Sequence, residues 1–174
     1  RQMVARGEDF KPPLIIFCQS QERAQALFME LLYDQIRVDV LHAGRSQAAR
    51  DQAVAKFRKG ETWVLISTDL VARGVDFRAV NMVINYDLPT SGVTYVHRIG
   101  RTGRAGRKGK AITMFTEADF DNLRAIANVM KQSGCDVPEW MLSLKNSKQK
   151  QKNAPRRAAI DTTPSYDKIK HYNK

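Results

Sequence analysis

The chain has 174 residues, of which 43% are hydrophobic, and it carries a formal net charge of +11. This length and apolar fraction suffice for one domain with a buried core. No run approaches roughly twenty apolar residues, so neither a membrane-spanning helix nor a membrane partner is expected. Two cysteines without metal-ligand spacing argue against a disulfide-rich secreted scaffold and give no metal site.

The positive charge is unevenly distributed along the chain. Residues 145–174 contain nine Lys and Arg against two Asp, a net charge of +7. Such a segment suits a polyanionic partner, with nucleic acid ahead of anionic lipid, or is simply a solvated end. We therefore expect a basic, flexible tail over 145–174 that follows a folded domain over 12–144. Because the sequence begins at Arg1, we also expect it to be part of a longer chain, with a linker over 1–11.

The first half of the domain predicts two strand–helix pairs. Residues 13–18 form a continuous apolar run introduced by prolines, which predicts a buried strand. Residues 20–35 predict an amphipathic helix with Ser20 as its N-cap and an apolar face made by Ala24, Leu27, Phe28, Leu31 and Leu32. A second strand at 38–42 and a second helix at 46–60 follow.

The second half continues the alternation. Strands are predicted at 62–68, 80–87 and 110–116, and helices at 92–100 and 117–134. Strands that alternate with helices in this way indicate βαβ units and a mostly parallel sheet. The apolar segment "WMLSL" that follows the last helix is expected to pack back on the domain.

The segment "STDLVARGVDF" directly follows a predicted strand and places a hydroxyl, carboxylates and a guanidinium on one turn. Thr68 could donate to a phosphate oxygen, and Asp76 could accept from a ribose hydroxyl. Gly74 allows a ligand or another backbone to approach closely. An ordinary turn capped by an aspartate is the alternative.

The segment "HAGRSQAARDQAVAKF" places Gln47 and Arg50 three residues apart at the start of a helix, so both lie on one face. Near a helix N-terminus both side chains could contact a phosphate or sugar. The alternative is a solvated helix face, with Arg50 paired to a nearby acid.

The segment "HRIGRTGRAGRKGK" has an arginine at every third residue from Arg98 to Arg107. Converging guanidiniums repel one another unless an anion lies between them, and each can grip a phosphate through two hydrogen bonds. This favours a polyphosphate or nucleic-acid ligand. A disordered arginine–glycine RNA tether is the alternative, although both flanks have the character of a core.

The sequence contains no G-x-x-x-x-G-K-[ST] loop, and no G-x-G-x-x-G follows a predicted strand. The domain could therefore complete a nucleotide site but is not expected to form one alone.

Taken in order, these segments resemble the C-terminal RecA-like domain of DEAD-box RNA helicases. "LIIFCQS", "HAGRSQAARDQAVAKFRKG", "ISTDLVARGVDF" and "HRIGRTGRAGRKG" are similar to the family's motifs IV, IVa, V and VI, and the resemblance covers about Pro12 to Gln132. It implies an α/β fold: a RecA-like three-layer αβα sandwich with a mostly parallel central sheet. It also implies ATP and Mg²⁺ as cofactors, held mainly by a first RecA-like domain that is missing here, so the fragment should not hydrolyse ATP alone.

The resemblance also implies roles for individual residues. Arg101 and Arg104 would be catalytic arginine fingers on the ATP phosphates. Asp76 and Gly74 would complete the ATP contacts, and His97 and Arg98 would tie the ATP site to the interdomain contact. RNA-backbone contacts are implied for Gln47, Arg50, Thr68, Arg73 and Gly74.

Two further features refine the resemblance. The family usually has His-Gly-Asp where this chain has His42-Ala43-Gly44, so no role is assigned to position 44. The stretches "GCDVPEWM" and "TTP" resemble the nucleolar branch that serves ribosome biogenesis and rRNA processing. This implies pre-ribosomal RNA, single-stranded or in short duplexes, as partner, and the nucleus, at the nucleolus, as location.

The leading hypothesis is therefore the second motor domain of an ATP-dependent RNA helicase, an ATP hydrolase in its full-length form. The main alternative is a non-catalytic RNA-binding module without any ATPase partner domain. A stand-alone Rossmann-type enzyme is disfavoured by the missing glycine fingerprint, and half of a DNA helicase or remodeller would share the architecture.

Overall fold

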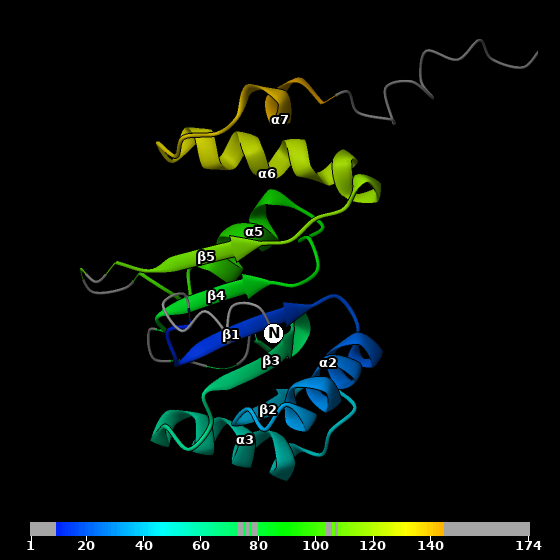
Figure 1. Cartoon of the computed structure of the whole chain (residues 1–174), viewed down its shortest axis with the longest axis vertical. Helices are drawn as coiled ribbons and strands as arrows, with labels where there is room; N and C mark the ends of the chain where they lie inside the picture. The colour runs from blue at the N-terminus through cyan, green and yellow to red at the C-terminus, as the bar shows by residue number, and fades with distance from the viewer. Residues whose placement is uncertain are drawn as a thin grey trace, which may run out of the picture.

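The central feature of the fold is a five-stranded sheet in which all neighbouring strands are parallel, in the order β2-β3-β1-β4-β5 (Figure 1). The computed structural model describes residues 10–72, 75, 77, 80–103, 106 and 108–144. The strands are β1 Leu14–Cys18, β2 Val38–Leu41, β3 Val64–Thr68, β4 Met82–Asn85 and β5 Lys110–Thr113. All five predicted strands are thus confirmed, although most are shorter than the apolar runs that predicted them.

Helices connect the strands. They are α2 Gln21–Tyr33, α3 Gln47–Lys59, α4 Asp69–Ala72, α5 Gly92–Ile99, α6 Phe120–Gln132 and α7 Glu139–Ser143, with a 3₁₀ turn, η1, over Glu117–Asp119. The four predicted helices are confirmed, and the single turn α4 was not predicted. None of the helices in the described ranges has the length and apolar character needed to cross a bilayer.

Serine hydroxyls begin three of the helices. Ser20, Ser46 and Ser91 each precede a helix and accept a hydrogen bond from the backbone N–H three residues later. Each hydroxyl satisfies one of the N–H groups that have no partner inside the helix. The predicted N-cap at Ser20 is therefore confirmed.

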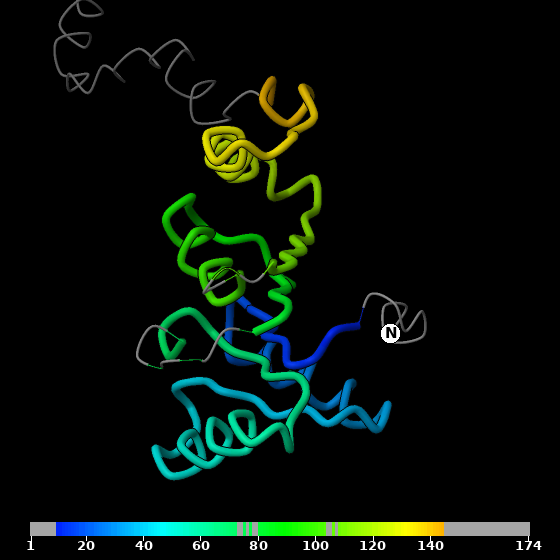
Figure 2. The backbone as a smooth tube through the Cα atoms, turned by 90° about the vertical axis from the view of Figure 1, so that its left-hand side faces the viewer, coloured from blue at the N-terminus to red at the C-terminus, as the bar shows by residue number. Residues whose placement is uncertain are grey.

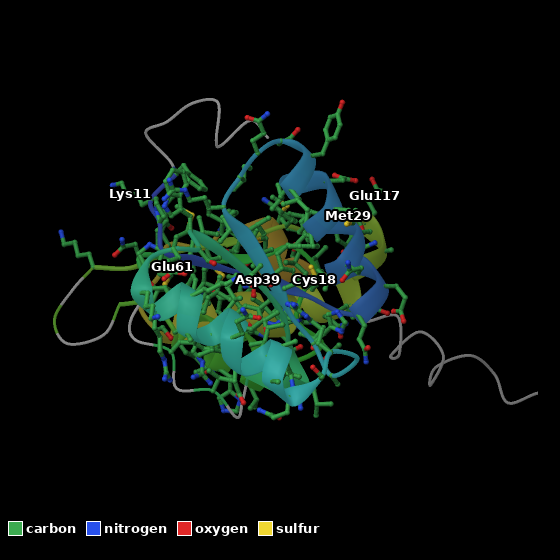
Figure 3. The ribbon with its side chains drawn as sticks, turned by 90° about the horizontal axis from the view of Figure 1, so that it is seen from below. Lys11, Cys18, Met29, Asp39, Glu61 and Glu117 are labelled. Carbon is green, nitrogen blue, oxygen red and sulfur yellow. The ribbon has the colours of Figure 1, made fainter. Side chains whose placement is uncertain are left out.

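The sheet is covered on both faces, which makes the three-layer αβα sandwich expected from the sequence. Alternate side chains of each strand point to opposite faces. Leu14, Ile16 and Cys18 of β1 join α2 in one core, whereas Ile15 and Phe17 join α3 and α4 in the other. Figure 2 shows α2 and α3 on opposite sides of the strands, and in Figure 3 Cys18 and Asp39 lie between these two helices.

A third apolar cluster lies beyond β5, where α5, α6 and α7 meet. In Figures 1 and 2 the pair α6 and α7 stands at one end of the molecule. Met141 of α7 is buried against Leu123 and Ile126 of α6. This confirms that the segment "WMLSL" packs back on the domain.

One expected core residue is not buried. Leu32 falls on the apolar face predicted for α2 but is 49% exposed, together with its neighbours Met29 and Tyr33. Only Ala24, Leu27 and Leu31 of α2 are buried. The face of the helix that contacts the sheet is therefore narrower than its apolar stripe. The expected tail 145–174 and most of the expected linker lie outside the described residues.

Candidate functional site

The carboxyl ends of all five strands meet at one edge of the sheet, because the strands are parallel. The turns that leave β1, β2 and β3 at this edge begin with Gln19, His42 and Asp69. Thr68, the last residue of β3, is buried at the same edge. The sequence-predicted site residues that the structure describes are grouped around these turns.

Gln47 and Arg50 are linked on the first turn of α3. The Arg50 guanidinium donates from Nη2 to Gln47 Oε1 at 2.6 Å, and Gln47 Nε2 donates to Asp51 Oδ1 at 2.8 Å. The Arg50 Nε–H is buried and has no hydrogen-bond partner within the described part of the chain. A buried donor without an acceptor is costly, so this arrangement favours an oxygen-rich ligand at Arg50.

Two hollows lie side by side at this edge. The α3 hollow, about 280 Å³, is lined by Gln47, Arg50 and neighbouring apolar side chains. The α2 hollow, about 380 Å³, is lined by the start of α2 and by residues 68–70. Ala43 and Leu70 line both hollows, so the two are neighbours, and the pair of hollows is named the groove. The groove runs across the ends of β1, β2 and β3 and offers a surface for an extended ligand.

Arg98 of α5 is the most fully buried charged side chain among the described residues, with 2% of its surface exposed. Its guanidinium forms a two-point ion pair with Asp69: Nε donates to Oδ1 at 2.6 Å, and Nη2 donates to Oδ2 at 2.7 Å. The guanidinium also lies over the ring of Phe17, at 5.2 Å. Arg98 thus joins α5 to the turn after β3.

The remaining donor of Arg98 contacts the end of β4. Nη1 donates to the backbone oxygen of Asp87 at 2.8 Å and to Asn85 Oδ1 at 3.3 Å. Burial opposes the charged form of the Asp87 carboxyl, but hydrogen bonds from Arg23 and the Gln19 N–H outweigh it, so the pKa of Asp87 is lowered. The carboxyl ends of β1, β3 and β4 are therefore joined in one charged network.

Arg101 and His97 lie close to Arg98 and Asp69. Arg101 Nη1 donates to the backbone oxygen of Val75 at 3.2 Å, and its guanidinium lies 5.8 Å from the centre of the Phe77 ring. The His97 side chain is exposed on α5. Together with Arg98, both line a small cavity of about 10 Å³ that Asp69 also borders.

The two ends of the arginine–glycine run lie against each other after α5. Thr102 pairs with Val80 and its hydroxyl donates to the Val80 oxygen at 2.6 Å. Gly103 has φ +68°, a left-handed conformation that favours glycine. A Cβ on Gly109 would collide with the Gly103 backbone and the Thr102 side chain. Gly103 and Gly109 are therefore needed where the two ends of the arginine–glycine run meet.

The structure places the predicted site residues in two groups. Gln47 and Arg50 line the α3 hollow and Thr68 lines the α2 hollow, whereas His97, Arg98 and Arg101 lie together around α5. The other predicted site residues, Arg73, Gly74, Asp76 and Arg104, lie outside the described residues.

Sequence reasoning assigned no role to Asp69, Asn85 or Asp51. Asp69 stands inside the quoted "STD" stretch, and a buried arginine needs an anionic partner. The need of a buried arginine for an anionic partner could have suggested a nearby acid. Nothing in the sequence, however, pairs Asp69 with Arg98, which is 29 positions away. Asp51 follows Arg50 directly and looks like an ordinary solvated acid.

Gly44 lies close to two side chains. His42 is buried, and a Cβ at Gly44 would lie 2.5 Å from Gln21 Oε1 and 3.1 Å from His42 Nδ1. Gln21 is exposed and its amide is the end of a flexible side chain, so a larger residue at position 44 would mainly require that amide to move. Within the described ranges, no three His, Cys, Asp or Glu side chains are placed to hold a metal ion.

Residues 3–106, more than half of the chain, match the family described as helicase conserved C-terminal domain. The chain is 56% identical over 171 residues to the mouse (Mus musculus) protein named probable ATP-dependent RNA helicase DDX52. That match covers 95% of this chain and 28% of the mouse protein, so the chain spans less than a third of this relative.

Two solved structures share the fold. The C-terminal domain of the DEAD-box protein Dbp5 has a TM-score of 0.67 and 36% identity, covering 76% of each chain. Dbp5 from S. cerevisiae bound to RNA and ADP BeF3 has a TM-score of 0.63 and 41% identity, covering 68% of this chain and 32% of that chain. The chain therefore belongs to the helicase conserved C-terminal domain family, as a RecA-like C-terminal domain of the DEAD-box type.

Proposed function

We propose that this domain is the second motor domain of an ATP-dependent RNA helicase. It would bind the RNA backbone along the groove and supply arginines to an ATP site completed by a first RecA-like domain. The observation that carries the proposal is the position of the turn after β3. Asp69 on this turn borders both the groove and the small cavity around His97, Arg98 and Arg101.

The groove suits a phosphate backbone. Arg50 has a buried Nε–H that finds no acceptor among the residues the structure describes, and its Nη2 is already linked to Gln47. Thr68 would contact the same strand from the floor of the groove, and Arg73 and Gly74 would contact it from the following segment. Contacts to phosphate and sugar rather than to base edges give sequence-tolerant binding to single strands. The RNA-bound structure of Dbp5, at 41% identity, supports this assignment.

The ATP side depends on a second domain. Arg101 and Arg104 would act as arginine fingers, Asp76 and Gly74 would complete the nucleotide contacts, and His97 would face the interdomain contact. The family resemblance implies the same interdomain role for Arg98, but within this domain Arg98 is already paired with Asp69. Hydrolysis by this fragment alone is not expected.

The arginine residues suit ATP phosphates better than they suit a metal ion. Guanidiniums bind phosphate oxygens, whereas Mg²⁺ prefers carboxylate and other oxygen ligands. The described residues offer no acidic cluster for the ion. Mg²⁺ would therefore be held mainly by the first domain, with its charge neutralising the phosphates.

The cellular role is a further proposal. The stretches "GCDVPEWM" and "TTP" resemble the nucleolar branch of the family. We therefore assign pre-ribosomal RNA, single-stranded or in short duplexes, as substrate and the nucleolus as location.

The test is RNA-stimulated ATP turnover by the full parent protein, comparing wild type with Arg101→Lys and Arg104→Lys. Lysine keeps the charge but loses the planar two-point grip. An arginine finger is worth about 10³ to 10⁵ in rate, so turnover should collapse while ATP affinity changes little. Unchanged turnover, or a parent without ATPase activity, would refute the motor assignment and favour the non-catalytic RNA-binding module.

A further inference from the structure

The ion pair between Asp69 and Arg98 stands between the two functional surfaces proposed above. Asp69 directly follows Thr68, at the floor of the groove, and Arg98 lies one helical turn before Arg101. The pair is short at both points, 2.6 and 2.7 Å, and Arg98 is 2% exposed. A two-point bond at this depth leaves the guanidinium little freedom to turn.

Asp69 is in contact with both sides at once. It lines the α2 hollow together with Thr68 and Leu70, and it also borders the cavity around α5 together with His97 and Arg101. A ligand that presses on the turn after β3 from the groove therefore acts on the same residue that anchors α5.

A second connection runs parallel to the first. Phe57 of α3 packs edge-on against Phe77, with ring centres 6.3 Å apart. The Arg101 guanidinium lies 5.8 Å from the centre of the same Phe77 ring, and it donates to the backbone oxygen of Val75. The helix that carries Gln47 and the helix that precedes Arg101 are thus both fastened to the segment after β3.

We propose that Asp69 is a positioning residue. Its carboxylate fixes Arg98, and with it α5 and Arg101, relative to the RNA-contacting turn, so that RNA in the groove sets the position from which Arg101 reaches the ATP phosphates. This role rests on the proposed function. In this role Arg98 links the RNA-contacting turn to α5 through the hydrogen bonds that it makes within the domain.

The experiment measures ATP turnover of the full parent protein against RNA concentration, with ATP and RNA affinities determined separately. The variants are Asp69→Asn, which keeps the shape but loses the charge, and Arg98→Lys, which keeps the charge but loses the fork. Coupling between two sites is commonly worth about 5- to 150-fold, so turnover at saturating RNA should fall by that factor. The readout is the ratio of turnover at saturating RNA to turnover without RNA, and this ratio should fall in both variants even where RNA-independent turnover or an affinity also changes.

A matched control separates this effect from the loss of any arginine–carboxylate pair. Asp39 of β2 accepts from Arg45 at 2.6 Å and lies away from α5. Asp39→Asn should keep the RNA stimulation of the wild type. Asp69→Glu, which restores a carboxylate at greater reach, should recover part of the stimulation.

Loss of one partner of a buried ion pair can prevent folding, whereas replacement of both by apolar residues is often tolerated. The double variant Asp69→Leu with Arg98→Met, checked for folding by near-UV circular dichroism, covers that case and should also lack RNA stimulation. Full RNA stimulation in folded Asp69→Asn, Arg98→Lys or the double variant would overturn the positioning role alone. A wild-type parent without RNA-dependent turnover would overturn the proposed function, and this role with it.

Discussion

Arg50 and Gln47 hold each other in place on the first turn of α3, since the guanidinium Nη2 donates to the amide Oε1 at 2.6 Å. The amide donates in turn to Asp51, so Gln47 is held from both sides. A pair that is ordered before the ligand arrives loses less side-chain entropy on binding. The geometry therefore suits the RNA-backbone contact that we propose for this pair.

Substitution of Arg50 should weaken RNA binding and reduce its dependence on salt. A hydrogen bond to a charged group is worth about 1.5–3 kcal/mol, so Arg50→Gln should lower RNA affinity by about 10- to 100-fold. The slope of log affinity against log salt should fall by about 0.7 if one phosphate contact on a single strand is lost. Fluorescence anisotropy with a single-stranded RNA at several salt concentrations measures both quantities.

The control for this prediction is Arg58→Gln, the same charge change on the last turn of the same helix. An equal loss of affinity and slope in both variants would mean that α3 acts only through its overall charge. Gln47→Ala removes no charge and should weaken binding without changing the slope.

Acid should destabilise the folded chain through His42. Burial and the nearby Arg45 lower the pKa of His42 below its ordinary 6.5, while Glu22 acts weakly in the opposite direction. Neither ring nitrogen has a hydrogen-bond partner among the described residues. Between the lowered pKa and 6.5 the unfolded chain binds more protons than the folded chain, so the free energy of unfolding falls as the pH drops through this window.

This contribution is fully present above pH 6.5 and is measured by urea unfolding at several pH values. His42→Gln should have a flatter pH dependence than the wild type, since carboxylates titrate equally in both. The matched control, His97→Gln, changes an exposed ring on α5 and should follow the wild type. Parallel curves for wild type and His42→Gln would contradict the prediction.

The two cysteines should differ sharply in reactivity. Burial, aided by the negative charge of Asp87, raises the pKa of the Cys18 thiol to about 12, whereas Cys135 is exposed. The thiolate is the reactive form of cysteine. A maleimide or Ellman's reagent near pH 8 should therefore modify the exposed Cys135 rapidly and Cys18 only when the chain unfolds. Figure 3 places Cys18 between α2 and α3.

Cys135→Ser should remove the fast reaction entirely and leave the slow one unchanged. Two fast thiols in the native protein would show that the core around β1 is open.

Gly92 is closely packed where α5 meets α6. A Cβ at this position would lie 2.8 Å from Val129 Cγ2 and 3.7 Å from the Ala125 oxygen. Although alanine favours helices by about 1 kcal/mol over glycine, overpacking costs about 1–3 kcal/mol, so Gly92→Ala should be neutral to destabilising by up to about 2 kcal/mol. Urea unfolding measures the difference.

A double-mutant cycle isolates the contact. Val129→Ala alone removes two partly buried methyl groups. Its addition to Gly92→Ala should cost less than it costs in the wild type, because the methyl group introduced at position 92 then has room. Strict additivity of the two changes would mean that α5 and α6 do not touch at these residues.

The amino-acid sequence by itself determined the order and type of the main elements. Continuous apolar runs indicated the five strands, and period-3.6 patterns with serine caps such as Ser20 indicated the helices. These signals are local, since they depend on residues within one or two turns of each other. The alternation of strands and helices then restricted the fold to a parallel sheet, and the motif spacing carried the resemblance to DEAD-box helicases, which the family match confirms.

Only the tertiary structure decided which side chains meet. Asp69 and Arg98 are 29 residues apart and pair because β3 and β4 end at the same edge of the sheet. Likewise, Leu32 is exposed although it continues an apolar stripe, since only Ala24, Leu27 and Leu31 of α2 are buried in the packed structure. Pairing and burial depend on the packing of segments that are distant in sequence, and local patterns carry no information about which of several buried charges will share a site.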